Sequence, residues 1–174
     1  MAELGNTEVV VEAAKGKISL PAPLYGRKHH VFCSPYNAGA KELAEELRGA
    51  DVFDTQGKKA SAPLTYTNDV GMREQCDHML LLLDARTWTS GEDTAKLVEH
   101  IHLALRAGVH VTCVHEFPSV VGPPRHACDF ARMFDDDWTP RHLASGRTNL
   151  YTEIALALKS LEWRKPGLVS LASK

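Results

Sequence analysis

Hydrophobic and polar residues follow one another in blocks along the middle of the chain. Residues 79–83 form an unbroken apolar run, residues 94–105 place apolar side chains at helical spacing, Gly108 follows as a helix stop, and residues 109–114 are apolar again. This pattern predicts a strand, a crossover helix and a second strand. An unbroken apolar run is typical of a strand that helices cover on both faces, so the pattern favours a buried parallel sheet.

The flanking segments continue the alternation of strands and helices. Strands are predicted at residues 30–33 and 64–67, and an amphipathic helix is predicted at residues 41–48. A last helix, capped by Asn149 and running to residue 161, is predicted because its leucines and alanines recur at helical spacing. Alternating strands and helices with short loops predict an α/β fold, a three-layer sandwich around a parallel, flavodoxin-like central sheet.

The 174 residues suit one domain with two short ends. The α/β domain is expected at residues 28–165. Residues 1–27 are expected to form an N-terminal extension, a hairpin or an ordered arm, because short β-prone runs flank a turn-prone segment there. Residues 166–174 are expected to form a C-terminal tail.

Charge and composition limit the classes of partner that this chain is expected to bind. Twenty Lys and Arg residues against 22 Asp and Glu residues leave a formal charge of −2, without a block of like charge suited to nucleic acid or a membrane surface. The apolar runs are far shorter than the roughly 20 residues of a membrane span, and the N-terminus lacks a signal-peptide pattern. We expect a cytoplasmic protein with no nucleic-acid partner and no direct membrane contact, which could be part of a longer chain. Four widely spaced cysteines favour reduced structural thiols.

Candidate chemistry is expected beyond the carboxyl ends of the strands, where parallel sheets bind ligands. These segments are residues 84–92, residues 116–124 and the loop at residues 34–39. The loop lacks the G-x-G-x-x-G pattern and the chain contains no G-x-x-x-x-G-K-[ST], so neither a dinucleotide fingerprint nor a P-loop is present. No metal site is expected, because Cys113 and His115 share one face of a strand while His110 faces the other, so no more than two of them could reach one ion.

The order of these parts resembles a TIR (Toll/interleukin-1 receptor) domain over residues 28–161. The loop SPYNAG after the first strand is similar to the Ser-Tyr-type loop of that family, and Asp84 with the downstream Trp88 is similar to the turn after its third strand. The later run CVHEFPSVVGPPRHACDFARMFDDDWTP is similar to divergent TIR-like modules of large multidomain algal proteins. The resemblance implies that residues 67–75 form a self-association loop, with Asn68, Asp69 and Met72 as its candidate residues.

The resemblance also implies two activities. Some TIR domains assemble signalling complexes, and others hydrolyse NAD+ at the nicotinamide-ribosyl bond with a helix glutamate. Breaking that bond develops oxocarbenium character, which a nearby carboxylate can stabilise. Glu99 is the implied catalytic residue. The residues implied to bind the substrate are Ser34, Tyr36, Asn37, Asp84, Trp88 and Glu92.

The register of the helix argues against Glu99 as a catalytic residue. Aligning residues 104–105 and Gly108 with the family places His100 at the catalytic position. At about 100° per residue, Glu99 also points roughly 155° away from the centre of the apolar helix face, so a bulge or a shifted start would be needed to turn it inward. We therefore expect a signalling or scaffold domain that associates with itself or with TIR-like partners. NAD+ hydrolysis is the alternative and a non-catalytic nucleotide sensor the second alternative, with NAD+ as a substrate or ligand and no cofactor.

Overall fold

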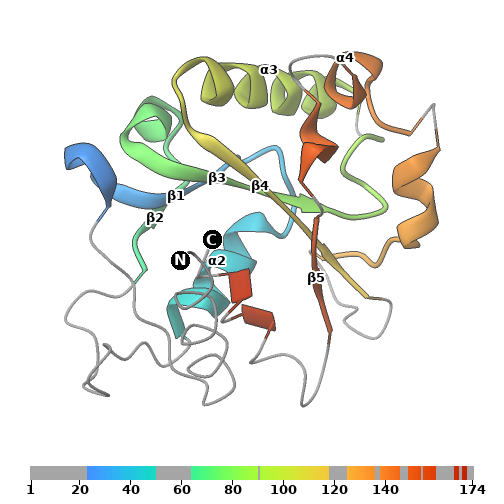
Figure 1. Cartoon of the computed structure of the whole chain (residues 1–174), viewed down its shortest axis with the longest axis horizontal. Coiled ribbons are helices and arrows are strands. Elements are labelled where there is room, and N and C mark those ends of the chain that lie inside the picture. The colour runs from blue at the N-terminus through green and yellow to red at the C-terminus, as the bar shows by residue number, and fades with distance from the viewer. Residues whose placement is uncertain are drawn as a thin grey trace, which may run out of the picture.

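Five parallel strands form one sheet in the order β2-β1-β3-β4-β5, in a computed structural model (Figure 1). The residues described are 23–49, 64–89, 91–117, 125–135, 138–145, 149–153, 155–159, 167–168 and 170–171. The strands are β1 His29–Cys33, β2 Tyr66–Thr67, β3 Cys76–Leu83, β4 His110–Glu116 and β5 Leu156–Leu158. The helices are α2 Ala40–Gly49, α3 Glu92–Arg106 and α4 Arg141–Ala144, with 3-10 turns η1 Leu24–Gly26, η2 Val70–Gln75, η3 Phe130–Phe134 and η5 Leu150–Thr152. Within these ranges, no helix combines the length and the apolar character that crossing a membrane requires.

The strand order is the flavodoxin-like order that the sequence predicts. Every neighbouring pair of strands is parallel, and β1 lies between β2 and β3. The chain therefore adds β2 on one side of β1 and then β3, β4 and β5 on the other. The carboxyl ends of β1 and β3 flank this reversal, which is the point where α/β proteins of this kind bind ligands.

The core consists of two apolar layers, one on each face of the sheet. Alternate residues of β3 from Met79 to Leu83 pack with α3, whereas Leu80 and Leu82 pack with α2. Figure 1 shows the two helices on opposite sides of the strands. All five β3 residues are at most 2% exposed. Burying one such side chain contributes about 2 kcal/mol, and burial on both faces is why the run contains no polar position.

Helix α3 ends at the glycine that the sequence marks as a stop. Gly108 has a φ of 68°, in the left-handed region that glycine adopts without strain. The N–H of Val109 donates to the Ala104 carbonyl at 2.9 Å, which is the long hydrogen bond of a Schellman-type helix end. This turn leads the chain directly from the helix into β4, so the predicted crossover is confirmed.

The predicted last helix is wrong. The Asn149 side chain accepts a hydrogen bond from the Tyr151 N–H at 2.9 Å, but the cap begins only the short turn η5. The chain then forms β5, which pairs parallel with β4. The outer edge of β4 presents backbone groups that another strand can satisfy, and Leu158, at 0% exposure, fills the layer on the α2 side. Pairing with β4 therefore decides for a strand, although the spacing of apolar residues predicts a helix. Leu156 and Leu158 also fit the alternation of a strand.

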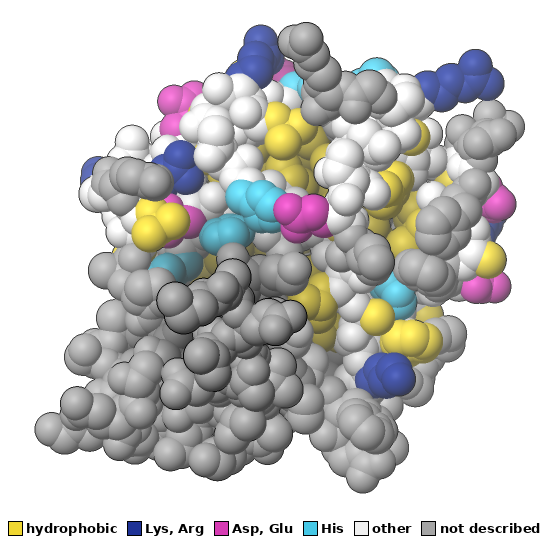
Figure 2. Space-filling model, in the orientation of Figure 1, with side chains coloured by type: hydrophobic (Ala, Val, Ile, Leu, Met, Phe, Trp, Pro, Cys, Tyr) yellow, Lys and Arg dark blue, Asp and Glu magenta, His cyan; other side chains and the backbone are white. Residues whose placement is uncertain are grey.

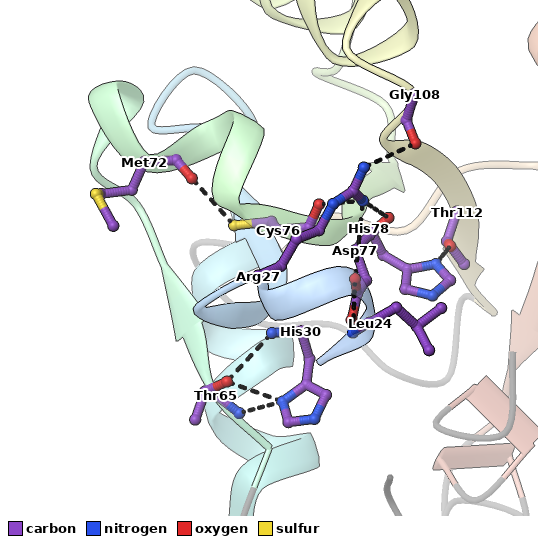
Figure 3. A network of polar contacts seen from close by, with 10 residues as sticks. All are labelled: Leu24, Arg27, His30, Thr65, Met72, Cys76, Asp77, His78, Gly108 and Thr112. Carbon is purple, nitrogen blue, oxygen red and sulfur yellow. Dashed lines mark hydrogen bonds and ion pairs between the residues drawn. The ribbon is translucent and has the colours of Figure 1, made fainter. Parts of the chain in front are cut away.

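A polar network ties the amino ends of the strands together (Figure 3). The Asp77 carboxylate accepts from the Leu24 N–H, with oxygen distances of 2.9 and 3.1 Å. Arg27 donates to the Cys76 carbonyl at 2.7 Å and lies 3.7 Å from the Asp77 carboxylate. The segment before β1 is thus held to the start of β3.

Both expected ends of the chain reach the domain body. Residues 24–27 of the expected extension hold to β3 through the network of Figure 3. The hairpin or arm expected nearer the N-terminus falls in residues 1–22, outside the described residues. Within the expected tail, Leu168 and Leu171 are buried in the layer on the α2 side of the sheet.

All four cysteines are free thiols in the interior: Cys33, Cys76, Cys113 and Cys128. Burial raises the pKa of Cys33, Cys76 and Cys113 to about 12. Because the thiolate is the reactive form, these three thiols are packing groups and not nucleophiles at neutral pH.

Candidate functional site

Asn37 clasps the loop after β1 to β3. Its Nδ2 donates to the Leu82 carbonyl at 2.9 Å, and the Leu82 N–H donates to its Oδ1 at 2.8 Å. The side chain is 3% exposed, and both polar ends of its amide are used inside the protein. Asn37 therefore lies at the strand ends, where it ties the loop after β1 to the end of β3.

Ser34 joins the end of β1 to helix α3. Its Oγ lies 2.9 Å from His100 Nδ1 and accepts a hydrogen bond from the Tyr36 N–H at 3.2 Å. The His100 ring also packs against Phe32 and Tyr36, with centroid distances of 5.8 and 5.3 Å. Burial first, and then the positive charge of Arg73, lower the pKa of His100. The imidazole is therefore neutral at pH 7, and its Nδ1 can accept the Ser34 hydroxyl proton.

Glu99 lies on the other side of α3. It is exposed and lines a surface groove beside His102 and Arg106, whereas His100 is buried. The structure thus brings His100, and not Glu99, together with Ser34 and Tyr36. The observed helix has the register that its apolar periodicity predicts, because Leu97 and Ile101 hold the same face against the sheet.

Asp84 organises the loop after β3. The side chain is 2% exposed, and its carboxylate accepts from the Arg86 N–H at 2.7 Å and from the His126 N–H at 3.3 Å. Burial raises its pKa, and these hydrogen bonds oppose the rise. Asp84 does lie at the strand ends, where the resemblance places it, but its oxygens are engaged by the backbone of two loops.

The two other candidate residues after β3, Trp88 and Glu92, lie in different environments. Trp88 is half-buried and packs edge-on to Trp138, with the ring centroids 6.4 Å apart. Glu92 is exposed at the start of α3, where its Oε1 lies 2.8 Å from the Lys96 ammonium. That ammonium is 5.2 Å from the centroid of Tyr36. The Tyr36 ring and the Lys96 ammonium therefore lie beside each other near the β1 loop, while Trp88 packs against the core on the α3 side.

An ion pair that the sequence does not reveal covers the strand ends. Arg125 Nη1 lies 3.2 Å from Glu116 Oε1 and 2.8 Å from Glu46 Oε2, and Glu116 is only 3% exposed. Arg125 passes directly over Gly39, where an added Cβ would collide with Arg125 Cγ. Glu116 was visible as the end of a predicted strand. Arg125 sits in a loop without pattern, so only the folded chain brings it to Glu116.

The turn after β2, η2, is held by local hydrogen bonds and lies against β1 and β3. Asp69 Oδ1 accepts from the Gly71 N–H at 2.9 Å, and the Met72 N–H donates to the Asp69 carbonyl at 3.0 Å. The Asp69 side chain therefore caps the 3-10 turn η2. Val70 is 39% exposed at its tip. The three residues of the expected self-association loop thus lie together around an exposed apolar side chain.

Histidine side chains gather on one face of the molecule, beside an acidic side chain (Figure 2). The rings of His78 and His110 lie 5.3 Å apart, and His110 Nε2 is 3.6 Å from Glu153 Oε2. His78 Nδ1 is 3.1 Å from Thr112 Oγ1. Within the part of the chain that the structure describes, no three His, Cys, Asp or Glu side chains are placed to hold a metal ion.

Comparison of the chain with protein-family models, with curated proteins and with solved structures found no match. The geometry of the strand ends and of the turn η2 is therefore the basis on which a function can be assigned.

Proposed function

We propose that this chain is a TIR-like binding module that works by associating with copies of itself or with TIR-like partners. The observation that supports this most is the orientation of α3. Its inward side presents the neutral imidazole of His100 to Ser34 and Tyr36, and the Glu99 carboxylate faces away from them.

Hydrolysis of a nicotinamide-ribosyl bond depends on a carboxylate that faces the developing positive charge. A neutral imidazole that packs against Tyr36 supplies no such charge. The buried carboxylates at this end, Asp84 and Glu116, are engaged by loop N–H groups and by the Arg125 guanidinium. Each interaction lowers the electrostatic stabilisation that the carboxylate could offer a substrate, so these contacts favour a structural role for the residues at the strand ends.

The turn η2 supports a role in association. Asp69 holds the turn through two hydrogen bonds, and its tip presents Val70 to solvent. A turn that is already ordered loses little conformational entropy when it binds. An apolar tip of this kind gains free energy when a partner covers it.

The test is a concentration series measured by light scattering and analytical ultracentrifugation. The wild-type chain should associate as its concentration rises, and Val70→Asp should weaken the affinity of self-association by about tenfold or more, which corresponds to about 1.4 kcal/mol. Leu24→Asp is the matched control, because Leu24 is also an exposed large apolar side chain, at 53% exposure, but lies outside the turn. A wild-type chain that stays monomeric at every concentration contradicts the proposal.

A nucleotide sensor is the second candidate, because the Lys96 ammonium lies 5.2 Å from the centroid of the Tyr36 ring, near the carboxyl end of β1. An aromatic ring can stack on a base and an ammonium can bind a phosphate. NAD+ and ADP-ribose should then raise the melting temperature of the wild-type chain and not that of Tyr36→Ala. A parallel assay for nicotinamide release tests the NAD+ hydrolase alternative, and turnover that Glu99→Ala abolishes would establish that alternative.

A further inference from the structure

Two histidines stand side by side near the amino ends of the central strands, at the other end of the sheet from the candidate functional site. His78 of β3 and His110 of β4 are register partners in the parallel sheet, so their side chains leave neighbouring backbone positions on the same face. Their ring centroids lie 5.3 Å apart, and the His110 side chain is 45% exposed. Strand pairing therefore brings together two nitrogen ligands that lie far apart in the chain.

The angle between the two rings matters, because the lone pair of an imidazole nitrogen lies in the plane of its ring. The planes of His78 and His110 are 80° apart, an arrangement in which a lone pair of each ring can point to one position. A second pair, His102 and His142, is stacked with planes only 19° apart. The lone pairs of that pair lie in nearly parallel planes and do not converge close to the rings. Of these two pairs, the one on the strands has the geometry that a single ion requires.

Thr112 prepares His78 to bind through one particular nitrogen. The Nδ1 atom of His78 lies 3.1 Å from Thr112 Oγ1 (Figure 3), and an Nδ1–H that donates to this oxygen leaves the lone pair on Nε2. A histidine that binds a metal usually donates its other N–H in this way, which fixes the tautomer and the ring orientation. Burial first, and then the neighbouring His110, lower the pKa of His78, so this ring is neutral at pH 7.

The charges around the histidine pair favour a cation. Glu153 Oε2 lies 3.6 Å from His110 Nε2, and the Glu153 side chain is 62% exposed. The guanidinium of Arg27 is offset by the Asp77 carboxylate, 3.7 Å away. Among the residues that the structure describes, no three potential ligands surround one point. The protein ligands are therefore the two imidazoles, and water molecules complete the coordination of the ion.

We propose that His78 and His110 bind one divalent transition-metal ion of the zinc, nickel or copper class, with the Glu153 carboxylate supplying negative charge beside it. Neutral imidazole suits these ions, whereas Mg²⁺ and Ca²⁺ prefer oxygen ligands. The sequence of β4 alone does not reveal this site, because one of the two ligands comes from β3. The site is separate from the turn η2, so the inference goes beyond the proposed association.

Isothermal titration calorimetry of the full chain with Zn²⁺ at neutral pH tests the site. The wild type should take up one ion per chain. His110→Gln should weaken the Zn²⁺ affinity by about 100-fold, because loss of one of two linked ligands removes the gain from binding through both. Thr112→Val should weaken it by about tenfold, because the hydrogen bond that orients His78 is lost. Mg²⁺ should give no binding to this nitrogen site.

His102→Gln is the matched control, because it removes a histidine from the stacked pair and leaves the strands unchanged. This variant should bind Zn²⁺ as tightly as the wild type. NMR spectra of the histidine ring nitrogens give a second measurement, in which Zn²⁺ should shift the signals of His78 and His110 at the ratio that saturates binding. His110 is exposed, so His110→Gln should fold, and circular dichroism checks this for each variant.

Three results would overturn the inference. The first is a wild type that takes up no Zn²⁺, and the second is an affinity that His110→Gln leaves unchanged. The third is a loss of binding in His102→Gln, because it would place the ion at the stacked pair. None of these results bears on self-association, which light scattering measures separately in the chain without added metal.

Discussion

The two sides of helix α3 differ sharply in what they leave available. The inward side carries Leu97, His100 and Ile101, all buried against the sheet or the β1 loop. The outward side carries Glu99 and Arg106, both exposed on a groove. Residues 99 and 100 are adjacent in sequence, yet the roughly 100° rotation per residue sends them to different environments. A one-residue difference in register therefore decides whether a carboxylate or an imidazole faces the loop after β1.

Several polar side chains at the strand ends make contacts within the protein. Asn37 pairs with Leu82, Asp84 with loop N–H groups, and Glu116 with Arg125. Polar atoms that already bind the protein's own loops are less available to bind a ligand. The contrast teaches that the position in the fold where ligands usually bind can instead serve to hold loops, and that the open surface lies elsewhere.

The largest expected effect comes from a cavity on the inward side. Ile101→Ala should lower the free energy of unfolding by about 3 to 4 kcal/mol, because Ile101 is fully buried and the removed methyl groups leave a void. Urea denaturation monitored by circular dichroism measures this loss. A loss below about 1 kcal/mol would mean that α3 does not pack on the sheet through this side.

The second-largest effect on stability is expected from removal of the Asn37 hydrogen bonds to Leu82. Asn37→Ala should lower the free energy of unfolding by about 2 to 3 kcal/mol, since it leaves the buried N–H and carbonyl of Leu82 without their partner. Asn68→Ala is the control, because Asn68 is exposed just before η2. This change should alter the free energy of unfolding by less than about 0.5 kcal/mol. Equal effects of the two changes would argue against the clasp.

The pH dependence of stability should carry a contribution from His100. Because burial lowers its pKa in the folded chain below the ordinary value of 6.5, the unfolded chain takes up the proton first as the pH falls. Stability is therefore full above pH 6.5 and declines as the pH drops from there to the folded pKa. His100→Gln should flatten the curve of unfolding free energy against pH in that window. An unchanged curve would show that His100 is not buried as a neutral group.

The smallest expected effect is on the outward side. Glu99→Ala should change the free energy of unfolding by less than about 0.5 kcal/mol, because the side chain is exposed and packs against nothing in the core. Its comparison with His100→Gln, one residue away, is the most direct measure of the difference between the two sides. A loss of stability above about 1 kcal/mol would indicate that Glu99 has turned inward.

The sequence predicted the central part of the fold because the signals there are local. Two-sided burial makes β3 a continuous apolar run, and the stop at Gly108 follows from the conformational freedom of glycine. The fifth strand escaped prediction because its three residues carry no pattern that separates them from a helix. Part of the site could also be predicted, since Ser34, Asn37 and Asp84 follow predicted strands and each lies at the carboxyl end of a strand.

Local sequence by itself determined where the first four strands and the central helix lie, and that Glu99 turns away from the apolar side of that helix, because periodicity and glycine stops act over a few residues. Only the tertiary structure decided that residues 156–158 complete the sheet, that Arg125 closes over Glu116, and that His100 meets Ser34. These contacts join segments far apart in the chain. Their formation depends on the total free energy of the packed state, which no short window of sequence contains.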